Sequence, residues 1–501
     1  DALPILSVQG VDSVCPTTVS NTVTVNKNRY EQSHDIKFVK IEDVEVTGTL
    51  YTTFSDDMRN QNEVYTGSDA VKIAFTKQGE AAPYDEVTVN SDGTFVAKLL
   101  TNEVYDVTVV EGPSGYTLSN LSSTYSLPGG DENPFKNVLL IKNDVDVPYT
   151  DTLYVGADKE YKTVNEAVSA VRMMADKGDK PVTIVIDPGT YKGQVIIDQS
   201  NITLKSADES NRPIITSYYG IGYVYYSLNG GFYNADYAAA KISKGVASKW
   251  GPTLYITDKG SGFLAENIDF ENTFNQYVTE EELADGVEMN EKMFERKAGV
   301  DVTTKNSTER AAAVATEGMN SEFYRCKIVS SQDTLYTGST GYFKECEIYG
   351  NTDYIFGGNS VAFENCDLVW YGYSDVESGG HIAASKTSSV TDPGYFFNNC
   401  TIKKNSMPGM KFAKGDFGRN WGGANSAMFF NNTTLDGVEK PGSWATMGGE
   451  LSLSRVFINY VHNAGETTDL TVGTDNPNGV AEKIPTVEDY VGDWTPVHYT
   501  K

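Results

Sequence analysis

Phe323-Tyr-Arg-Cys326-Lys-Ile328 opens a phrase that recurs along the second half of the chain. It returns as Phe343-Lys-Glu-Cys346-Glu-Ile348 and Phe363-Glu-Asn-Cys366-Asp-Leu368, and more loosely as Phe397-Asn-Asn-Cys400-Thr-Ile402, Phe430-Asn-Asn-Thr433-Thr-Leu435 and Ala265-Glu-Asn-Ile268-Asp-Phe270. The first three cysteines are spaced 346 − 326 = 20 and 366 − 346 = 20. A period near 20 with apolar residues at i, i+3 and i+5 suits one coil of a parallel β-helix and is too short for a propeller blade or a helical repeat. The sequence therefore predicts an all-β solenoid.

The cysteines of this repeat are predicted to be packing residues. Adjacent coils of a β-helix lie about 4.8 Å apart, so the Phe, Cys and Ile columns would each stack inside the solenoid. A buried free cysteine behaves as a small hydrophobic residue. Packing is therefore favoured over disulfides or metal ligation, and no CxxC pair suggests zinc.

A helix is predicted just before the repeats. Thr163-Val-Asn-Glu166 is a capping box, and apolar residues follow at helical spacing, which indicates a helix of roughly four turns. Strands resume at Val182 to Ile186. We expect the helix to cover the open end of the solenoid, where it would hide apolar surface and unpaired strand edges.

The chain before this helix has a different pattern. Short alternating strands are predicted at Val44 to Leu50, Val71 to Phe75, Glu86 to Val89, Thr94 to Leu99 and Tyr105 to Val109, with a hairpin at Asp92-Gly93. The pattern is typical of a small β-sandwich and is similar to carboxypeptidase-regulatory-like or transthyretin-like modules. We predict an extended lead-in at residues 1–34, a β-sandwich accessory domain at 35–146 and the β-helix domain at 147–501.

Composition excludes some classes of partner. The 501 residues carry 40 Lys plus Arg against 68 Asp plus Glu, which gives a net charge of −28 without any basic tract. Nucleic acid and anionic membrane surfaces are therefore poor partners. The apolar runs are far shorter than the about 20 residues that a membrane-spanning helix needs, so no membrane insertion is expected.

Two aspartates share the phase of the repeat. Asp333 lies in Ser331-Gln-Asp-Thr-Leu-Tyr336, Asp353 lies in Thr352-Asp-Tyr-Ile-Phe-Gly357, and their spacing is 353 − 333 = 20. The two carboxylates are therefore expected side by side on successive coils, on a polar outer face that would form a groove for a linear polymer. Two such close carboxylates do not both ionise easily, so one should stay protonated as an acid while the other remains an anion. That division suits acid/base or nucleophilic catalysis and outweighs the alternative of two solvated turn residues.

At this point the sequence resembles the pectin methylesterase (pectinesterase) family of carbohydrate esterases over residues 150–501. The motifs that carry the resemblance are Tyr161-Lys-Thr-Val-Asn-Glu-Ala-Val168, Pro188-Gly-Thr-Tyr191, Gly262-Phe-Leu-Ala-Glu-Asn-Ile-Asp-Phe-Glu-Asn-Thr273, Gln332-Asp-Thr-Leu-Tyr336, Asp353-Tyr-Ile-Phe-Gly357, Gly418-Arg-Asn-Trp421 and Gly492-Asp-Trp494. Their order and spacing are specific together, although each alone is weak. The resemblance implies a right-handed parallel β-helix that hydrolyses galacturonate methyl esters in pectin and releases methanol, without a metal or other cofactor.

The resemblance also implies roles for individual residues. Asp353 would be the nucleophile, and Asp333 would protonate the departing methoxide and later activate water. Gln332 would donate a hydrogen bond to the oxyanion, and Arg419 would pair with Asp353 to keep it ionised. Aromatic positions that would line the sugar groove are Trp421, Tyr336 and Phe356, although Phe356 also suits simple packing.

One departure and two insertions are unlike the family pattern. The family usually has Gln-Ala-Val-Ala-Leu one coil before the catalytic aspartate, with that Gln as a second oxyanion donor, but the matching position here is Ala312. Loss of such a donor costs on the order of a hundredfold in rate. An acidic insertion at 274–308 is expected to be a solvated surface helix, and the tyrosine-rich insertion at 218–250 suits either a sugar-stacking wall or a packed loop.

Alternative functions stay open. A non-catalytic pectin-binding surface protein on an esterase scaffold is favoured by Ala312 and opposed by the intact Gln332, Asp333, Asp353, Arg419 and Trp421. Another β-helical pectinase is the other rival, although neither the calcium cage of a lyase nor the acids of a polygalacturonase are visible. Because polymeric pectin does not enter cells, we expect a monomer that is secreted or displayed at the cell surface.

Overall fold

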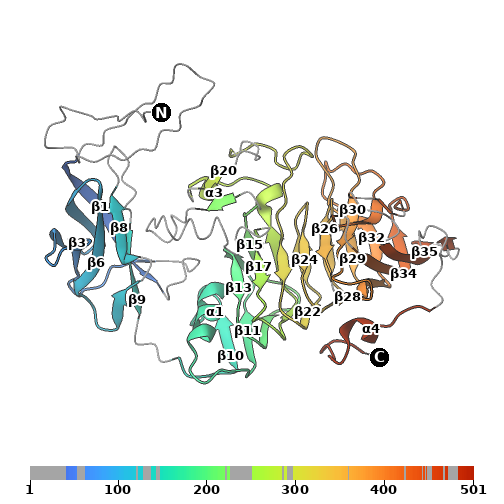
Figure 1. The fold of residues 1–501 in the computed structure, drawn as a ribbon, viewed down its shortest axis with the longest axis horizontal. Coiled ribbons are helices and arrows are strands. Elements are labelled where there is room, and N and C mark those ends of the chain that lie inside the picture. Colours follow the sequence, from blue (N-terminus) through green and yellow to red (C-terminus); the bar gives the residue numbers. More distant parts are fainter. Residues whose placement is uncertain are drawn as a thin grey trace, which may run out of the picture. The chain divides into compact units, whose positions relative to one another are not determined.

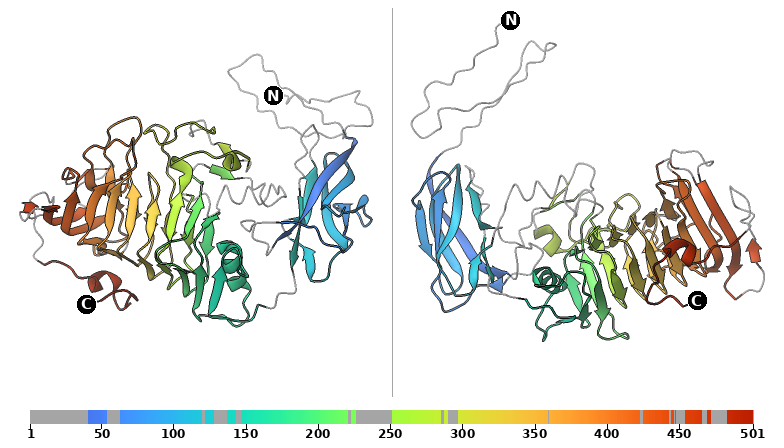
Figure 2. Two further views of the ribbon diagram at one scale, coloured as in Figure 1. Left: turned by 180° about the vertical axis from the view of Figure 1, so that it is seen from behind. Right: turned by 60° about the horizontal axis from the view of Figure 1, so that its bottom comes forward.

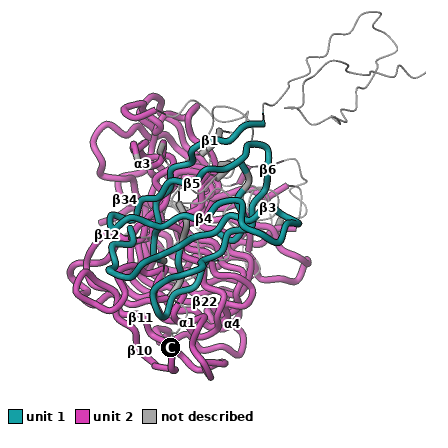
Figure 3. Tube along the Cα trace, turned by 90° about the vertical axis from the view of Figure 1, so that its left-hand side faces the viewer, with its two compact units in different colours: residues 1–144, 227–235 teal, residues 145–226, 236–501 magenta. Residues whose placement is uncertain are grey.

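The structure is a computed structural model of the 501-residue chain. It describes residues 41–53, 63–119, 122–127, 137–142, 147–220, 223–225, 251–284, 287–289, 297–358, 360–422, 425–442, 444–445, 447, 454–465, 469–471 and 483–500. The chain divides into two compact units, one of residues 1–144 with 227–235 and one of residues 145–226 with 236–501 (Figure 3). The predicted lead-in at residues 1–34 lies outside the described residues.

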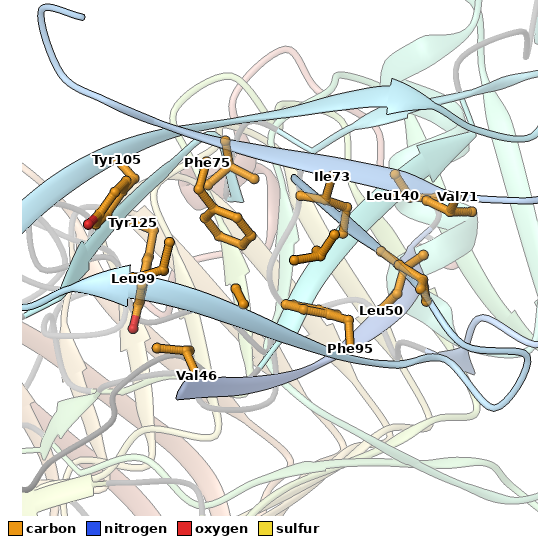
Figure 4. Close-up of a cluster of buried hydrophobic side chains, with 14 of the residues drawn as sticks. Val46, Leu50, Val71, Ile73, Phe75, Phe95, Leu99, Tyr105, Tyr125 and Leu140 are labelled. Atoms are coloured by element: carbon orange, nitrogen blue, oxygen red, sulfur yellow. The ribbon is translucent and has the colours of Figure 1, made fainter. Parts of the chain in front are cut away.

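The first unit is a β-sandwich. One sheet has the order β2-β1-β9-β7 with β5 paired to β1, and the other has the order β4-β3-β6-β8. Apolar side chains from both sheets meet in one core, where the rings of Phe75 and Phe95 have centroids 6.3 Å apart (Figure 4). The strands are β1 (Asp43–Thr53), β2 (Glu63–Val64), β3 (Lys72–Lys77), β4 (Asp85–Thr88), β5 (Thr94–Leu100), β6 (Glu103–Glu111), β7 (Tyr116–Leu118), β8 (Thr124–Leu127) and β9 (Asn137–Lys142).

The hairpin predicted at Asp92-Gly93 is wrong, although the turn forms. The amide of Gly93 donates to the carbonyl of Asn90 at 2.9 Å, and Gly93 has φ 82°. However, β4 pairs with β3 whereas β5 pairs with β1, so the two strands belong to different sheets. Both strands bury their alternate side chains in the shared core, and alternation alone does not tell a ladder partner from a strand of the facing sheet.

The second unit is a parallel β-helix. Its coils follow one another in sequence from β10 to β35 (Figure 1), and they are paired in parallel at the same register from coil to coil. One seven-stranded sheet consists of β13 (Val195–Ile197), β17 (Leu254–Ile256), β21 (Val314–Thr316), β24 (Leu335–Thr337), β27 (Ile355–Gly357), β30 (His381–Ser385) and β33 (Asp416–Asn420). This sheet carries the candidate site.

An 18-stranded sheet forms the other sides of the coils. Its last strand, β36, is antiparallel to β35. The strands are β10 (Thr152–Val155), β11 (Val182–Ile186), β12 (Thr190–Lys192), β14 (Ile202–Ser206), β15 (Ile214–Ser217), β18 (Leu264–Glu266), β19 (Asp269–Asn272), β22 (Ser321–Tyr324), β23 (Lys327–Val329), β25 (Gly341–Lys344), β26 (Glu347–Gly350), β28 (Ser360–Glu364), β29 (Asp367–Trp370), β31 (Gly394–Asn398), β32 (Thr401–Lys404), β34 (Ser426–Asp436), β35 (Ser454–Asn463) and β36 (Asp469–Thr471).

The repeated phrase builds the interior, as predicted. The rings of Phe323, Phe343 and Phe363 stack with centroids 4.7 and 4.9 Å apart, and the column continues through Phe397 and Phe430. The four cysteines Cys326, Cys346, Cys366 and Cys400 are buried free thiols. Each thiol donates to a backbone carbonyl of the preceding coil, for example Cys366 Sγ to the Phe343 oxygen at 3.4 Å. Cys15 lies outside the described residues.

The residue before each cysteine makes the bend between two strands. It has positive φ in every copy of the phrase, from 51° at Arg325 to 55° at Asn267 and Asn399. Asparagine tolerates this left-handed conformation better than most residues, which explains its recurrence at Asn267, Asn365, Asn399 and Asn432. The left-handed backbone at this bend therefore explains why a polar residue recurs inside an otherwise apolar phrase.

Helix α1 (Val164–Met173) covers the first coils, as predicted (Figure 2). Thr163 is the N-cap, and both hydrogen bonds of the capping box with Glu166 are formed. Its buried face includes Ala167, Val168 and Val171. The helix has 10 residues, about three turns rather than the four predicted, because Met174 leaves the helical conformation with ψ 118°.

Helix α4 (Glu488–Val491) and the tail after it pack on the outer side of the solenoid. Tyr490 stacks on Phe396 with centroids 5.3 Å apart. His498 lies between two carboxylates, with Nδ1 2.8 Å from Glu322 and Nε2 3.0 Å from Glu266. The C-terminal Gly492-Asp-Trp494 motif thus belongs to a segment that covers apolar side chains of the coils.

The two insertions are described only in part. In the acidic one, a short 3-10 helix η3 (Thr273–Asn275) precedes α3 (Glu280–Ala284), and β20 (Val287–Met289) pairs with β16 (Tyr223–Tyr225) of the tyrosine-rich insertion. The expected solvated helix is wrong in this part, because Glu282 is only 1% exposed and α3 has five residues. Most of residues 226–250 lie outside the described residues, so the role predicted for them stays a prediction.

Candidate active site

The two aspartates lie on neighbouring coils at the start of the seven-stranded sheet. Leu335 of β24 pairs with Ile355 of β27, and each aspartate lies two residues before its strand. The Asp333 amide donates to the Thr352 carbonyl at 3.1 Å, which joins the two bends directly. The side chains are therefore one coil apart, about 4.8 Å along the solenoid.

Both aspartates are buried in strained bends. Asp333 and Asp353 are 7% and 6% exposed, and their φ angles are 57° and 50°. The buried amide of Asn351 holds the bends in place, since it donates to Ser331 Oγ at 2.9 Å and to the Gly372 carbonyl at 3.0 Å. Left-handed aspartates that are fixed by their surroundings are typical of functional sites.

Arg419 holds the carboxylate of Asp353. Its Nε lies 2.8 Å from one oxygen and its terminal nitrogen 2.5 Å from the other, which is a bidentate pair. Arg419 pairs in register with Ala384 of β30, so its side chain crosses that strand to reach the coil of Asp353. A small residue at position 384 leaves room for this crossing.

The electrostatic environments of the two aspartates differ. Burial, followed by the charge of Asp353, raises the pKa of Asp333 well above its usual value, and Arg310 and Arg419 oppose this only in part. Asp353 instead has one guanidinium nitrogen of Arg419 on each of its two oxygens. The arrangement places a carboxyl group of raised pKa beside a carboxylate that a guanidinium holds.

Gln332 and Ala312 complete the row beside Asp333. Ala312 lies on the coil before Asp333, two residues before Val314, which pairs with Leu335, and is fully buried. Its backbone carbonyl accepts a hydrogen bond from the Asn272 side chain at 2.8 Å. Gln332 is partly exposed and makes no side-chain hydrogen bond within the described part of the chain, so its amide is free to donate.

The aromatic residues form one group on the outer face of the sheet. Tyr336 and Phe356 are register partners with centroids 5.3 Å apart, and Trp421 meets Phe356 edge-on at 5.6 Å. Phe356 is 2% exposed, whereas Tyr336 and Trp421 are partly exposed. Phe356 therefore supports the other two rings, which are the partly exposed members of this group. Lys386 Nζ lies 5.5 Å from the centre of the Trp421 ring.

Sequence reasoning missed three residues beside this site. His381 follows Asp353 in the same row, one coil further, and its Nδ1 lies 3.2 Å from Asp416 Oδ2 on the next coil. Burial and then the Arg419 charge lower the pKa of His381, so the ring is neutral at neutral pH. Arg310 forms a backbone bridge with Gln332.

A fixed repeat of 20 residues does not predict that these residues lie beside the two aspartates. The coil from Asp353 to His381 has 381 − 353 = 28 residues, and the next coil has 416 − 381 = 35. A signal does exist, because His381-Ile-Ala-Ala-Ser385 and Asp416-Phe-Gly-Arg-Asn420 each begin with a titratable residue and continue as a short buried strand, like Asp353-Tyr-Ile-Phe-Gly357.

Comparisons with known proteins agree with this geometry. Residues 283–475, which include both aspartates and Arg419, match the family model described as Pectinesterase. This part of the chain, less than half of its length, is similar to the pectinesterase family. No curated protein sequence matches the chain.

Solved pectin methylesterases are similar in structure. One from Aspergillus niger is 22% identical, with 69% of this chain and 95% of that chain covered and a TM-score of 0.49. PemA from Erwinia chrysanthemi is 22% identical, with 70% and 99% covered and a TM-score of 0.49. The carrot enzyme is 20% identical, with 64% and 86% covered and a TM-score of 0.45.

Metal-ligand and membrane features were also sought. Within the described ranges, no group of three or more His, Cys, Asp or Glu side chains is arranged to hold a metal ion. No helix in the same ranges is long and apolar enough to cross a membrane.

Proposed function

We propose that this chain hydrolyses the methyl esters of galacturonate in pectin and releases methanol and de-esterified pectin. The observation that carries the proposal is the pair of buried aspartates on adjacent coils, one held by a bidentate arginine and the other with a raised pKa. The match of residues 283–475 to the Pectinesterase model supports the substrate class. Solved structures of similar proteins include complexes of pectin methylesterase with hexasaccharides.

In the first half of the proposed reaction, a carboxylate oxygen of Asp353 attacks the ester carbonyl carbon. The carbonyl oxygen becomes an oxyanion, to which the Gln332 amide donates a hydrogen bond. Collapse of this intermediate breaks the bond to the methoxy oxygen, and Asp333 gives that oxygen its proton, so methanol leaves. The products are an anhydride between Asp353 and the substrate and an ionised Asp333.

The second half restores the enzyme. Ionised Asp333 takes a proton from a water molecule, whose oxygen attacks the acyl carbon of the anhydride. The bond to the Asp353 oxygen breaks, the carboxyl group of galacturonate forms and loses its remaining proton to solvent, and Asp333 is protonated again. Arg419 stabilises the Asp353 anion both before attack and as the leaving group.

Roles for the aromatic residues follow from their exposure. Tyr336 and Trp421 present partly exposed rings beside the aspartates, and such rings suit contact with the apolar faces of sugars. Phe356 contributes by holding both rings in place. The reaction as proposed needs no metal ion, because the acid, the nucleophile and the oxyanion donor are all side chains of the chain.

The test is methanol release from highly methylated pectin, with and without a chelator. The parent chain is compared with Asp353→Asn and with a matched control, Asp269→Asn, which breaks another aspartate–arginine pair of 3.0 Å far from the site. We expect chelator-resistant release that is abolished by Asp353→Asn and kept by Asp269→Asn. An inactive parent that still binds immobilised pectin would refute the esterase and favour the binding protein to which Ala312 points.

A further inference from the structure

The site as described has one evident donor for the oxyanion. The Arg419 guanidinium is engaged with both oxygens of Asp353, at 2.8 and 2.5 Å. Ala312, on the coil before Asp333, ends in a methyl group and has no side-chain donor. Gln332 thus remains as a single neutral donor, whereas negative charge that develops in a water-poor site is stabilised best by several fixed donors or by a cation.

Arg310 lies at the position from which a second donor would act. It forms a parallel bridge with Gln332, which in turn bridges to Thr352 beside Asp353. The amide of the next residue, Ala311, donates to the Gln332 carbonyl at 3.1 Å. Arg310 and Gln332 are therefore direct neighbours on adjacent coils, at the edge of the two aspartates.

The backbone that carries Arg310 is firmly held. The buried side chain of Asn275 donates to the Glu309 carbonyl at 2.6 Å and accepts from the Glu309 amide at 2.9 Å. The segment before it, which we call the strap (residues 301–308), is tied to the loop at 374–378. These ties include Ser374 Oγ to Asp301 at 2.6 Å and Lys305 Nζ to Ser378 Oγ at 2.8 Å.

The strap thereby connects the coil before Asp333 with the coil after Asp353. Its contacts pass across the two coils that carry the aspartates, since residues 301–308 precede β21 and residues 374–378 precede β30. A segment that is fixed at both ends holds the backbone of Arg310 in a constant place beside Gln332, and only the side chain has to turn toward a substrate.

The positive charge of Arg310 acts on Asp333. Among the charges that lower the pKa of Asp333, Arg310 ranks ahead of Arg419, while burial, Asp353 and Glu309 raise it. The partner of Arg310 is its neighbour Glu309, with Nε 3.2 Å from Oε1, and the arginine side chain is 44% exposed. An exposed pair of this kind is weak, so the guanidinium can turn to a substrate at little cost.

We propose that Arg310 is a further catalytic residue, whose guanidinium donates a hydrogen bond to the oxyanion of the tetrahedral intermediate beside Gln332. It supplies, from the end of the insertion, the interaction that Ala312 does not offer. The inference rests on the proposed esterase function. It predicts that the donor property of residue 310, and not only its charge, sets the turnover rate.

The test compares two neutral replacements of similar length, Arg310→Gln and Arg310→Met. Both remove the charge beside Asp333, but only glutamine keeps an N–H donor. We expect Arg310→Met to lower kcat on the order of a hundredfold, with KM changed less than about twofold, and Arg310→Gln to keep a kcat at least about tenfold above that of Arg310→Met. Arg325→Met, whose arginine is 47% exposed and paired with Glu345 at 2.8 Å on the opposite side of the coils, is the matched control and should keep parental kcat.

Other outcomes have distinct meanings. Equal kcat losses in Arg310→Gln and Arg310→Met, with the same shift of the pH profile, would overturn the proposal and leave Arg310 acting only through the charge felt by Asp333. A rise in KM with unchanged kcat would also overturn it, because Arg310 would then bind a carboxylate of the polymer. An inactive parent chain would instead show that the esterase function itself is wrong.

Discussion

Arg419→Lys tests the proposed role of the arginine with the smallest change in charge. The guanidinium makes two hydrogen bonds to Asp353, at 2.8 and 2.5 Å, and the Asp353 side chain is 9% exposed. A lysine ammonium is a point charge that does not reproduce this fork. One hydrogen bond to a buried carboxylate is therefore lost, while the positive charge stays.

The size of the effect follows from the lost hydrogen bond. A hydrogen bond to a charged group contributes about 1.5–3 kcal/mol, and about 1.4 kcal/mol corresponds to a factor of ten in rate. If the fork aims the nucleophile, Arg419→Lys should lower kcat by roughly 10-fold to 150-fold. The assay is methanol release from highly methylated pectin at saturating substrate, with circular dichroism to confirm the fold.

Arg325→Lys is the matched control. Arg325 also binds a carboxylate, that of Glu345 at 2.8 Å. This pair is solvent-exposed, because 47% of the Arg325 side chain and 35% of the Glu345 side chain are accessible. Exposed pairs contribute about 0–1 kcal/mol, so activity should stay within about twofold of the parent. A folded Arg419→Lys variant with kcat equal to that of Arg325→Lys would refute the role given to the Arg419 fork.

Three further predictions concern pH dependence and stability. Because the folded pKa of Asp333 is raised, its proton persists above the usual range, and kcat/KM should fall as pH rises through that pKa. A kcat/KM that instead rises with pH on the alkaline side, where the protein stays folded, would contradict Asp333 as the acid. The free energy of unfolding should depend on pH for the same reason. The contribution of Asp333 is complete below the pKa that this group has in the unfolded chain and is lost as pH rises through its pKa in the folded protein, which urea titrations at several pH values can measure. Phe363→Ala removes a ring whose centroid lies 4.9 Å from that of Phe343 and 4.7 Å from that of Phe397, and should lower the free energy of unfolding by about 3–5 kcal/mol. The control Val390→Ala, at a 62% exposed position, should change it by less than about 0.5 kcal/mol. His498→Ala removes the imidazole beside Glu322, whose side chain is 3% exposed, and leaves the backbone amides of Val497 and His498 as its donors. Thermal denaturation should show a loss of about 1–3 kcal/mol, and an unchanged melting temperature would mean that the imidazole does not stabilise this contact.

The features that the sequence alone determined are those with short range or a constant period. The spacing of Cys326, Cys346 and Cys366 fixes which residues lie above one another, because equal coils place equal phases in one column. The same argument placed Asp333 beside Asp353. The N-terminus of α1 was also predictable, since both capping-box hydrogen bonds are local to Thr163 and Glu166.

Only the tertiary structure decided the features that depend on pairing between distant segments. The strands on either side of Gly93 alternate alike, and only the shared core separates them into two sheets. After Asp353 the coils lengthen to 28 and 35 residues, so spacing no longer predicts which side chains meet. The register of β30 and β33 places His381 beside Asp416 and directs Arg419 across Ala384 to Asp353. Arg310 reaches Gln332 because Asn275 and the strap hold its backbone, and these contacts join residues that no local pattern relates. The physical reason is that a regular solenoid fixes position through its period, whereas the loops between strands are free to vary in length, and only packing and hydrogen bonding determine where their side chains lie.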